Sequence, residues 1–346
     1  MISWPDVLGR LLRGEDLDDT ATAAVMEQIM AGEATSAQVA GFLMALRAKG
    51  ETAAEIAGLV RGMRGFALAV EVSGDVVDTC GTGGDRAGTF NVSTVAAIVA
   101  AGAGATVAKH GNRAASGRCG SADLLEDFGI VIDLPPAAVS RCIDQVGIGF
   151  CFAPTFHPAM RHAMITRREL GVPTVFNFLG PLTNPAGAQH QTIGVSDPAM
   201  APRMAQVLAR LGTRHALVFH GADGLDELTT TGPSTVWEVR GDQVEQSTLN
   251  PDDLGLAPAT VADLRGGDVS DNRRIAEAVL AGEPGPPRDI VLLGAAAALV
   301  AANRVDGFPA GLTAAAKAID SGEAAQVLQR WVQVSQNLRT GGAGAG

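Results

Sequence analysis

Residues 78–85, DTCGTGGD, running on through residues 89–94, TFNVST, are the most informative stretch of this chain. A short apolar run precedes the stretch, three of its last five positions are glycine, and an apolar helical pattern follows from Val95. Glycines let a backbone turn tightly and present N–H groups to an anion, which the positive end of a helix dipole also attracts. The stretch therefore predicts a phosphate-binding loop between a strand and a helix, although a glycine turn without a ligand gives the same pattern.

The loop matches neither of the two common phosphate-binding motifs. A Walker A loop ends in Gly-Lys-Ser/Thr, and a dinucleotide fingerprint counted from Gly81 needs glycine where Arg86 stands. A second loop, residues 109–123 (KHGNRAASGRCGSAD), follows another short apolar segment at 105–108. It combines glycines and serines with four groups that can carry positive charge, which are Lys109, His110, Arg113 and Arg118.

The charge of the second loop differs from that of the whole chain. The chain has 26 basic and 37 acidic residues, for a net charge of −11, yet this loop holds one acid at its end. We interpret it as an anion site, with a solvated basic loop as the alternative. Two anion loops that follow two strands suggest a ligand with more than one phosphate group.

An acidic turn, residues 221–227 (GADGLDE), follows the expected buried strand at 216–219. The adjacent carboxylates of Asp226 and Glu227 repel each other unless a cation lies near them. Mg²⁺ binds hard oxygen ligands of this kind and is often shared with substrate phosphates. The turn predicts a Mg²⁺ site, and a solvated acidic turn is the alternative.

Further segments carry a resemblance to a known family: 152–162 (FAPTFHPAMRH), 167–171 (RRELG) and 176–185 (FNFLGPLTNP). Together with the three loops, and in this order, they resemble the anthranilate phosphoribosyltransferase family over about residues 5–337. The resemblance implies transfer of a 5-phosphoribosyl group from 5-phosphoribosyl 1-pyrophosphate (PRPP) to the amine of anthranilate, with Mg²⁺, in tryptophan biosynthesis. Arg86, Gly117 and Cys119 depart from the family pattern, which puts individual hydrogen bonds in question more than the activity.

The same resemblance assigns the site residues. The donor, PRPP, is expected at Gly81, Gly84, Asp85, Thr89, Asn91, Val92, Ser93, Thr94, Lys109, His110, Gly111, Asn112, Arg113, Ala114, Ala115, Ser116, Gly117 and Ser121. The metal ion is expected at Ser93, Asp226 and Glu227. Anthranilate is expected at Gly81, His110, Asn112, Pro154, His157, Met160 and Arg167.

No residue is assigned as catalytic, although His110 is a candidate general base. Breaking the C1 bond of the donor builds positive charge on the ribose and negative charge on pyrophosphate, so electrostatic stabilisation and proximity suffice for catalysis. His110 and His157 can also be read as structural histidines. Arg167 lies on an expected inward helical stripe with Ala163 and Met164, where a charge needs a partner. That partner is either an internal carboxylate or the carboxylate of anthranilate.

The chain is expected to fold as an α/β protein with a small all-helical N-terminal domain and a large domain with a mainly parallel sheet. Residues 1–70 show only helical periodicity. Strands are expected at 76–80, 105–108, 130–133, 148–152, 190–195 and 215–219, with helices at 91–102, 121–128, 136–146 and 198–211. A hairpin at 235–239 and 244–248 precedes helices at 268–281, 287–302 and 310–337, the last broken near 321–322.

This organisation gives a helical domain at 1–70, a donor-binding domain at 71–340 and a disordered tail at 341–346. Family resemblance, rather than periodicity, implies that the chain returns to the helical domain at about 165–185 and forms a homodimer through it. The fold is therefore expected to be of the nucleoside phosphorylase and phosphoribosyltransferase type.

Composition limits the other function classes. The longest apolar runs, 95–108 and 290–302, are shorter than the roughly 20 residues that span a bilayer. The start lacks an export signal, and the four cysteines form no CxxC pair, so we expect reduced thiols and a cytoplasmic protein. Two other functions remain open: a pyrimidine nucleoside phosphorylase, and a non-catalytic nucleic-acid-binding relative, which a pI near 5.0 disfavours.

Overall fold

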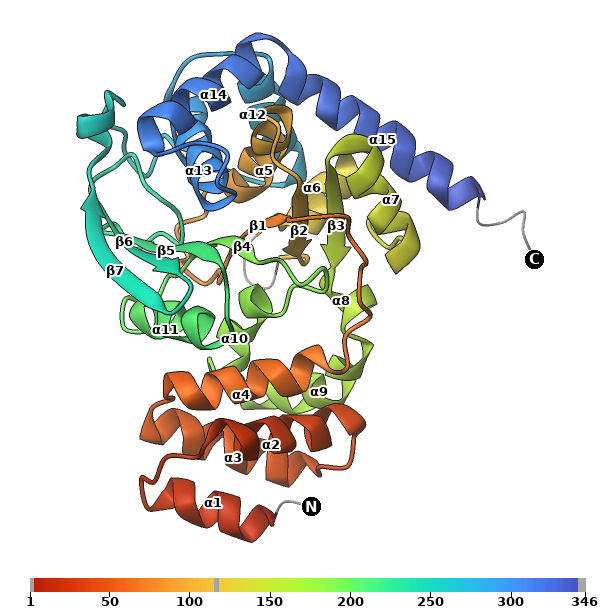
Figure 1. Ribbon diagram of the computed structural model, residues 1–346, viewed down its shortest axis with the longest axis vertical. Helices are drawn as coiled ribbons and strands as arrows, with labels where there is room; N and C mark the ends of the chain where they lie inside the picture. Colours follow the sequence, from red (N-terminus) through yellow and green to blue (C-terminus); the bar gives the residue numbers. More distant parts are fainter. Residues whose placement is uncertain (1–2, 115–117, 342–346) are drawn as a thin grey trace.

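The computed structural model describes residues 3–114 and 118–341, which form a helical unit and a larger α/β unit (Figure 1). The helical unit begins with α1 (Trp4–Leu12), α2 (Asp19–Ala31), α3 (Ser36–Lys49) and α4 (Ala53–Arg64). Polar side chains fix where these helices begin. The hydroxyl of Ser3 accepts the N–H of Asp6, and Thr35 and Thr52 each form a capping box at the start of α3 and α4.

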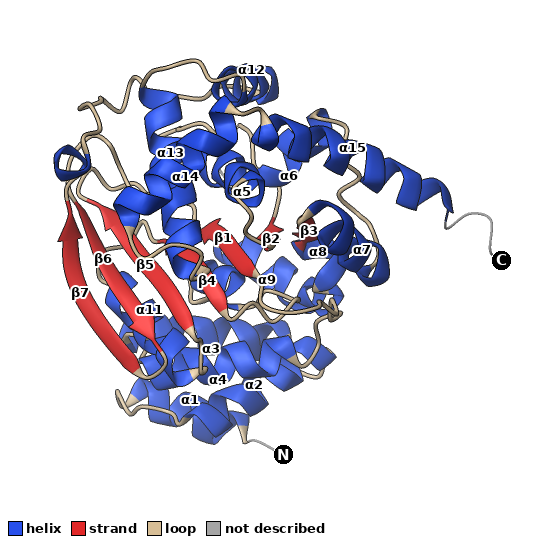
Figure 2. Cartoon of the chain, turned by 45° about the horizontal axis from the view of Figure 1, so that its top comes forward, coloured by secondary structure: helices blue, strands red, loops and turns tan. Residues whose placement is uncertain are grey.

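The α/β unit is built on a sheet that is mostly parallel (Figure 2). Within the described residues its strands are β1 (Val77–Gly81), β2 (Val107–Gly111), β3 (Ile148–Phe152), β4 (His190–Gly194), β5 (His215–Gly221), β6 (Ser234–Arg240) and β7 (Gln243–Leu249). Their spatial order is β3-β2-β1-β4-β5-β6-β7, in which the β5–β6 and β6–β7 pairs are antiparallel and the other four pairs are parallel. The expected fold class and the expected hairpin are confirmed.

The order of the strands locates the crevice in which ligands bind in such sheets. The chain builds outward from β1 to β2 and β3, and then crosses to β4 on the other side of β1. Open parallel sheets bind ligands beyond the carboxyl ends of their strands, at the point where the order reverses. In this protein that point lies beyond Gly81 of β1 and Gly194 of β4.

Helices cover both faces of the sheet (Figures 1 and 2). They are α5 (Val92–Gly102), α6 (Ser121–Asp127), α7 (Pro136–Val146), α11 (Ala201–Arg210), α12 (Val269–Leu280), α13 (Pro286–Ala301), α14 (Phe308–Asp320) and α15 (Glu323–Gly341), with a 3-10 turn at Pro251–Leu254. One apolar core packs α5, α13 and α15 together and contains Ile98, Leu293 and Trp331. A second core packs α11 and one face of strands β4, β5 and β6 against the helical unit. It includes Phe42 and Val207.

The chain passes back to the helical unit after β3. This segment consists of α8 (Ala153–Phe156), a 3-10 turn (Pro158–Met160), α9 (Arg161–Leu170), α10 (Phe176–Leu179) and a second 3-10 turn (Gly180–Leu182). Helix α9 packs on α2 and α3, and α10 packs on α4. Ala163 and Phe176 are buried in the second core, and the guanidinium of Arg64 donates to the carbonyl of Leu182 at 2.7 Å.

One expected strand is wrong. Residues 130–133 pair with no strand, because the N–H of Val131 donates instead to the hydroxyl of Ser335 in α15 at 3.2 Å. Ile130 and Ile132 are apolar because they pack in the first core, and not because they belong to a sheet. The expected break in the last helix is confirmed by Gly322, whose φ of +80° separates α14 from α15.

Two predicted features lie partly outside the described residues. The parts outside are Ala115, Ser116 and Gly117 of the second loop and residues 342–346 of the tail. Across residues 3–114 and 118–341, no helix has both the length and the apolar character needed to cross a membrane.

Candidate active site

Glycines allow the acidic turn to lie directly over the ends of two strands. A Cβ atom on Gly81 would lie 2.1 Å from Oδ2 of Asp226, and one on Gly194 would lie 1.6 Å from the carbonyl oxygen of Asp226. Any larger residue would push the turn away. The side chain of Asp226 then accepts the N–H of Gly83 at 2.7 Å, so the acidic turn contacts the first loop directly.

The first loop has a left-handed backbone at several positions, including Gly83 at φ +66° and Gly84 at φ +86°. Arg86 has φ +58°, a region in which a side chain other than hydrogen is strained and which glycine adopts readily. Ser196 holds the loop through a hydrogen bond from its hydroxyl to the carbonyl of Gly83 at 2.8 Å. Ser196 belongs to no motif, and only the fold brings it to the loop.

The start of α5 connects the first loop to the second. Thr89 forms an isolated bridge with Arg265, and Asn91 donates from its side chain to the carbonyl of Cys119 at 3.2 Å. Asn272 of α12 supports the same turn, because its side-chain oxygen accepts the N–H of Asn91 at 3.0 Å. The two predicted anion loops therefore lie against each other.

Three predicted donor and metal residues meet at the first turn of α5. The N–H of Ser93 donates to Oε1 of Glu227 at 3.2 Å, and Nζ of Lys109 lies 3.4 Å from the hydroxyl of Ser93. Lys109 is only 1% exposed and also donates to the carbonyl of Thr79 at 2.5 Å. Burial lowers the pKa of Lys109, while the nearby charge of Asp78 opposes that shift.

The paired carboxylates of the acidic turn are partly buried. Burial, and then the charge of Asp85, raises the pKa of Asp226 to about 7, and burial, and then the charge of Asp226, raises the pKa of Glu227 to about 8. Two such groups suit a cation. Among the described residues, no three His, Cys, Asp or Glu side chains are grouped as a complete metal site. The pair nevertheless fits Mg²⁺, which usually needs one or two carboxylates together with substrate phosphates.

The second loop carries less positive charge than expected. Burial, and then the charge of His157, lowers the pKa of His110 to about 3, so His110 is neutral. Arg113 keeps its positive charge but forms ion pairs with Asp123 and Glu126, each at 2.8 Å. The expectation of four positive groups is therefore wrong for His110, which burial keeps neutral, while the acids of α6 offset the charge of Arg113.

The other described residues of the loop shape its backbone. Gly111 ends β2, and a Cβ atom there would lie 2.3 Å from the hydroxyl of Ser121. That hydroxyl donates to the carbonyl of Asn112 at 3.2 Å, and the N–H of Ala114 donates to Asp123 at 3.1 Å.

The predicted acceptor residues come from the ends of β1 and β2 and from residues 153–170. The rings of His110 and His157 lie 5.1 Å apart, and Nδ1 of His110 is 3.0 Å from the carbonyl of Gly180. Burial lowers the pKa of His157 to about 4. The Nε2 atoms of both rings are buried without a hydrogen-bond partner. Buried polar atoms normally have a partner, and a bound ligand could supply one here. Pro154 lies in α8 and Met160 in the following 3-10 turn.

Arg167 is half-buried on α9 without a carboxylate partner. Its guanidinium lies 5.1 Å from the centre of the Phe176 ring and 3.9 Å from the sulfur of Met164, and burial lowers its pKa. No acid within 4.0 Å pairs with it among the described residues, so the internal-carboxylate alternative finds no support there. The expected inward stripe is wrong at Met164, which is 51% exposed, because the buried positions of α9 are Ala163 and Thr166.

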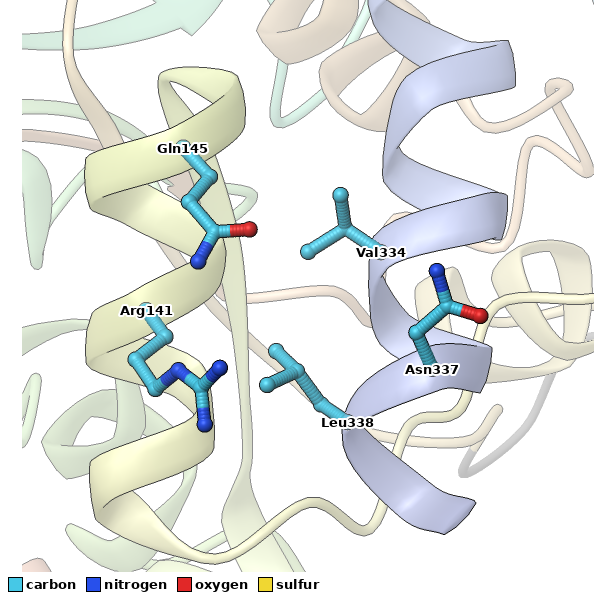
Figure 3. Close-up of a pocket in the computed structure, with 5 residues that line it drawn as sticks. All are labelled: Arg141, Gln145, Val334, Asn337 and Leu338. Atoms are coloured by element: carbon cyan, nitrogen blue, oxygen red, sulfur yellow. The ribbon is translucent and has the colours of Figure 1, made fainter. Parts of the chain in front are cut away.

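A surface hollow of about 430 Å³ lies elsewhere, between α7 and α15 (Figure 3). It is lined by Arg141, Gln145, Val334, Asn337 and Leu338. None of these residues belongs to the loops or to the acceptor segment.

Comparison with known proteins agrees with the geometry. The chain matches the glycosyl transferase family, a/b domain, over residues 73–325 and the helical bundle domain of the same family over residues 5–67. A relative from Roseiflexus castenholzii named anthranilate phosphoribosyltransferase is 56% identical over 332 residues, which cover 95% of this chain and 98% of the relative.

Solved structures of the same kind superimpose over nearly the whole chain. The crystal structure of anthranilate phosphoribosyltransferase from Thermus thermophilus is 44% identical, with a TM-score of 0.91 over 96% of this chain and 99% of that one. The Saccharomyces cerevisiae enzyme in complex with PRPP and Mg is 28% identical, with a TM-score of 0.88 over 96% and 98%. The same yeast enzyme is also known in complex with 4-fluoroanthranilate, with a TM-score of 0.86 at 27% identity over 97% and 99%. This chain belongs to the anthranilate phosphoribosyltransferase family.

Proposed function

We propose that this protein transfers the 5-phosphoribosyl group of PRPP to the amine of anthranilate, giving N-(5-phosphoribosyl)anthranilate and pyrophosphate in tryptophan biosynthesis. One observation carries the proposal: a chain of contacts runs from Lys109 through Ser93 and Glu227 to the turn at Asp226 and on to Gly83. Both anion loops and the paired carboxylates thus surround one place, beyond the carboxyl ends of β1 and β2.

The donor is proposed to bind between the two loops. The glycine-rich first loop and the positive end of the α5 helix dipole suit the phosphates, and Lys109 adds a buried positive charge. Ser93, Asp226 and Glu227 would hold Mg²⁺, which when bound offsets the negative charge of the donor and of departing pyrophosphate. The binding of PRPP and Mg by the yeast relative supports this assignment.

Anthranilate is proposed to bind at the His110 and His157 pair, with its carboxylate on Arg167. A guanidinium can grip a carboxylate with two parallel hydrogen bonds. With a pKa of about 3, His110 is a weak base at neutral pH, which argues against general-base catalysis by this residue. The chain then accelerates the reaction by holding the amine next to C1 and by stabilising the leaving group.

We also propose a homodimer through the helical unit and a cytoplasmic location. Leu12, Met44, Met164 and Ile165, from α1, α3 and α9, are large apolar side chains that lie exposed in the single chain. Burial of such a surface against a second copy would stabilise a dimer. The four cysteines, Cys80 among them, are free thiols, as a reducing compartment maintains them.

The two alternative functions are not favoured. The relatives and solved structures compared above carry the anthranilate phosphoribosyltransferase name at up to 56% identity over nearly the whole chain. A net charge of −11 opposes binding to a nucleic-acid backbone.

Loss of anthranilate fluorescence, followed in the presence of PRPP and Mg²⁺, tests the proposal. We expect turnover that depends on all three components. A parallel incubation with uridine and inorganic phosphate tests the nucleoside phosphorylase alternative. Release of uracil without consumption of anthranilate would refute the proposed function.

A further inference from the structure

Strands β1 and β2 separate just where they approach the site. The register of β1 with β4, and that of β2 with β3, continues over five residue pairs each. In contrast, β1 and β2 are in register only at Val77 and Val107. Beyond that pair, the backbone pairing of the two strands stops, and each strand leads into one of the two anion loops.

Three buried side chains replace the missing backbone pairing. Oδ1 of Asp78 accepts the N–H of His110 at 2.9 Å, and Nζ of Lys109 donates to the carbonyl of Thr79 at 2.5 Å. The side chain of Asn184 donates to the carbonyl of Ala108 at 2.7 Å. Because buried backbone groups need partners, these side chains make the separated arrangement stable.

Asp78 is the one carboxylate of this group, and it is fully buried, at 0% exposure. Burial raises its pKa, whereas hydrogen bonds from Asn184 and His110 and the charge of Lys109 lower it. A buried charge without a counter-charge is strongly destabilising. Asp78 and Lys109 each provide the opposite charge for the other. Asp78 belongs to none of the donor, metal or acceptor sets above.

Asn184 connects the same group to the acceptor pocket. It is 3% exposed and lies in the segment that returns from the helical unit. The same segment provides Gly180, whose carbonyl contacts Nδ1 of His110. The spacing of β1 and β2 thereby sets the position of the His110 ring relative to the first loop.

We propose that Asp78 is a positioning residue, which holds the ends of β1 and β2 at the separation where donor and acceptor meet. It acts through Lys109 and His110 and touches neither substrate. Asn184 is its partner in this role. The proposal rests on the proposed function, because it concerns the distance between C1 of PRPP and the amine of anthranilate.

The test compares Asp78→Asn with Glu55→Gln, both of which keep side-chain size and remove one charge. Glu55 is a matched control: it is fully buried, accepts the N–H of Leu17 at 3.0 Å and pairs with Lys49 at 3.0 Å, but it lies in the helical unit. The midpoint of thermal unfolding, kcat and both KM values are measured for each variant well below its unfolding temperature.

We expect Asp78→Asn to lower kcat at saturating substrates by roughly 10- to 100-fold, since displacement of reacting groups by about 1 Å has this effect. Both KM values should stay within about threefold of wild type, because the binding groups remain. Glu55→Gln should lower the unfolding temperature comparably and leave kcat unchanged.

A kcat within twofold of wild type for Asp78→Asn would overturn the positioning role, as would an effect confined to the KM for PRPP. If Asp78→Asn fails to fold, Asn184→Ser is measured instead, because it removes the hydrogen-bond donor to the carbonyl of Ala108. The same kcat and KM results would then overturn the positioning role. A wild-type protein without anthranilate turnover would instead refute the proposed function, and the positioning role with it.

Discussion

Replacement of Arg167 by lysine is the sharpest test of how the acceptor is held. Arg167 has no carboxylate partner within 4.0 Å among the described residues, and its guanidinium packs on the ring of Phe176 at 5.1 Å. A positive charge that is half-buried in this way is available to the carboxylate of a substrate. Lysine keeps the charge but loses the planar fork that makes two parallel hydrogen bonds.

The expected loss follows from one charge-assisted hydrogen bond, which is worth about 1.5–3 kcal/mol. This corresponds to a fall of roughly 10- to 150-fold in kcat/KM for anthranilate. The KM for PRPP should change little, because the donor loops lie on β1 and β2. The contact with Phe176 contributes about 0.5–1 kcal/mol at most, so the unfolding temperature should move by only a few degrees.

Arg168→Lys is the matched control, since Arg168 is the next residue on α9 and is exposed. Anthranilate fluorescence gives kcat/KM for both variants at saturating PRPP. Equal effects of the two substitutions would refute the acceptor role of Arg167. Unfolding of the Arg167→Lys variant would refute it too, and would indicate a structural role.

Four further outcomes are expected. Asp226→Ala combined with Glu227→Ala should lower turnover by more than about 100-fold. It should also abolish the rise in unfolding temperature that millimolar Mg²⁺ produces in the wild type, because a ligand stabilises only the state that binds it. A variant that Mg²⁺ still stabilises would refute the metal assignment. Ser93→Ala should raise the KM for PRPP several-fold more than that for anthranilate, and equal changes would show that α5 does not face the donor. Burial lowers the pKa of His110 from 6.5 to about 3, so only the unfolded chain takes up this proton as pH falls below 6.5, and the contribution of neutral His110 to stability, present above pH 6.5, is lost toward pH 3. His110→Asn should therefore reduce the loss of unfolding free energy between pH 6.5 and 5.0, measured in urea, by about 2 kcal/mol. An unchanged loss would mean that His110 titrates normally. Ile165→Glu on the exposed side of α9 should convert a dimer into a monomer in sedimentation experiments, and a monomeric wild type would contradict the proposed interface.

Local signals made much of the fold predictable. Short apolar runs that alternate with helical patterns predict the parallel strands, and β3 has the expected bounds. Periodicity cannot distinguish a strand from a buried connection, and this explains the error at residues 130–133. The N–H of Val131 donates to Ser335 of α15, which lies about 200 residues later in the chain.

The charge state of the site was less predictable than its location. Glycine spacing places both anion loops at strand ends, and the fold brings them together with the acidic turn. Sequence alone does not reveal that His110 is neutral or that Arg113 is paired, because burial in the folded chain decides the first and the acids of α6 decide the second. The same is true of Asp78, whose proposed positioning role depends on the short β1–β2 pairing, which no spacing in the sequence signals.

A crystal structure of the protein with PRPP, Mg²⁺ and an unreactive anthranilate analogue tests the central claim most directly. We predict that the pyrophosphate lies between the loop at Gly83 and the loop that begins at Lys109, with Mg²⁺ next to Asp226 or Glu227. The carboxylate of the analogue should lie on Arg167, with its ring beside His110. A donor bound away from either loop, or an analogue whose carboxylate does not contact Arg167, would contradict the account.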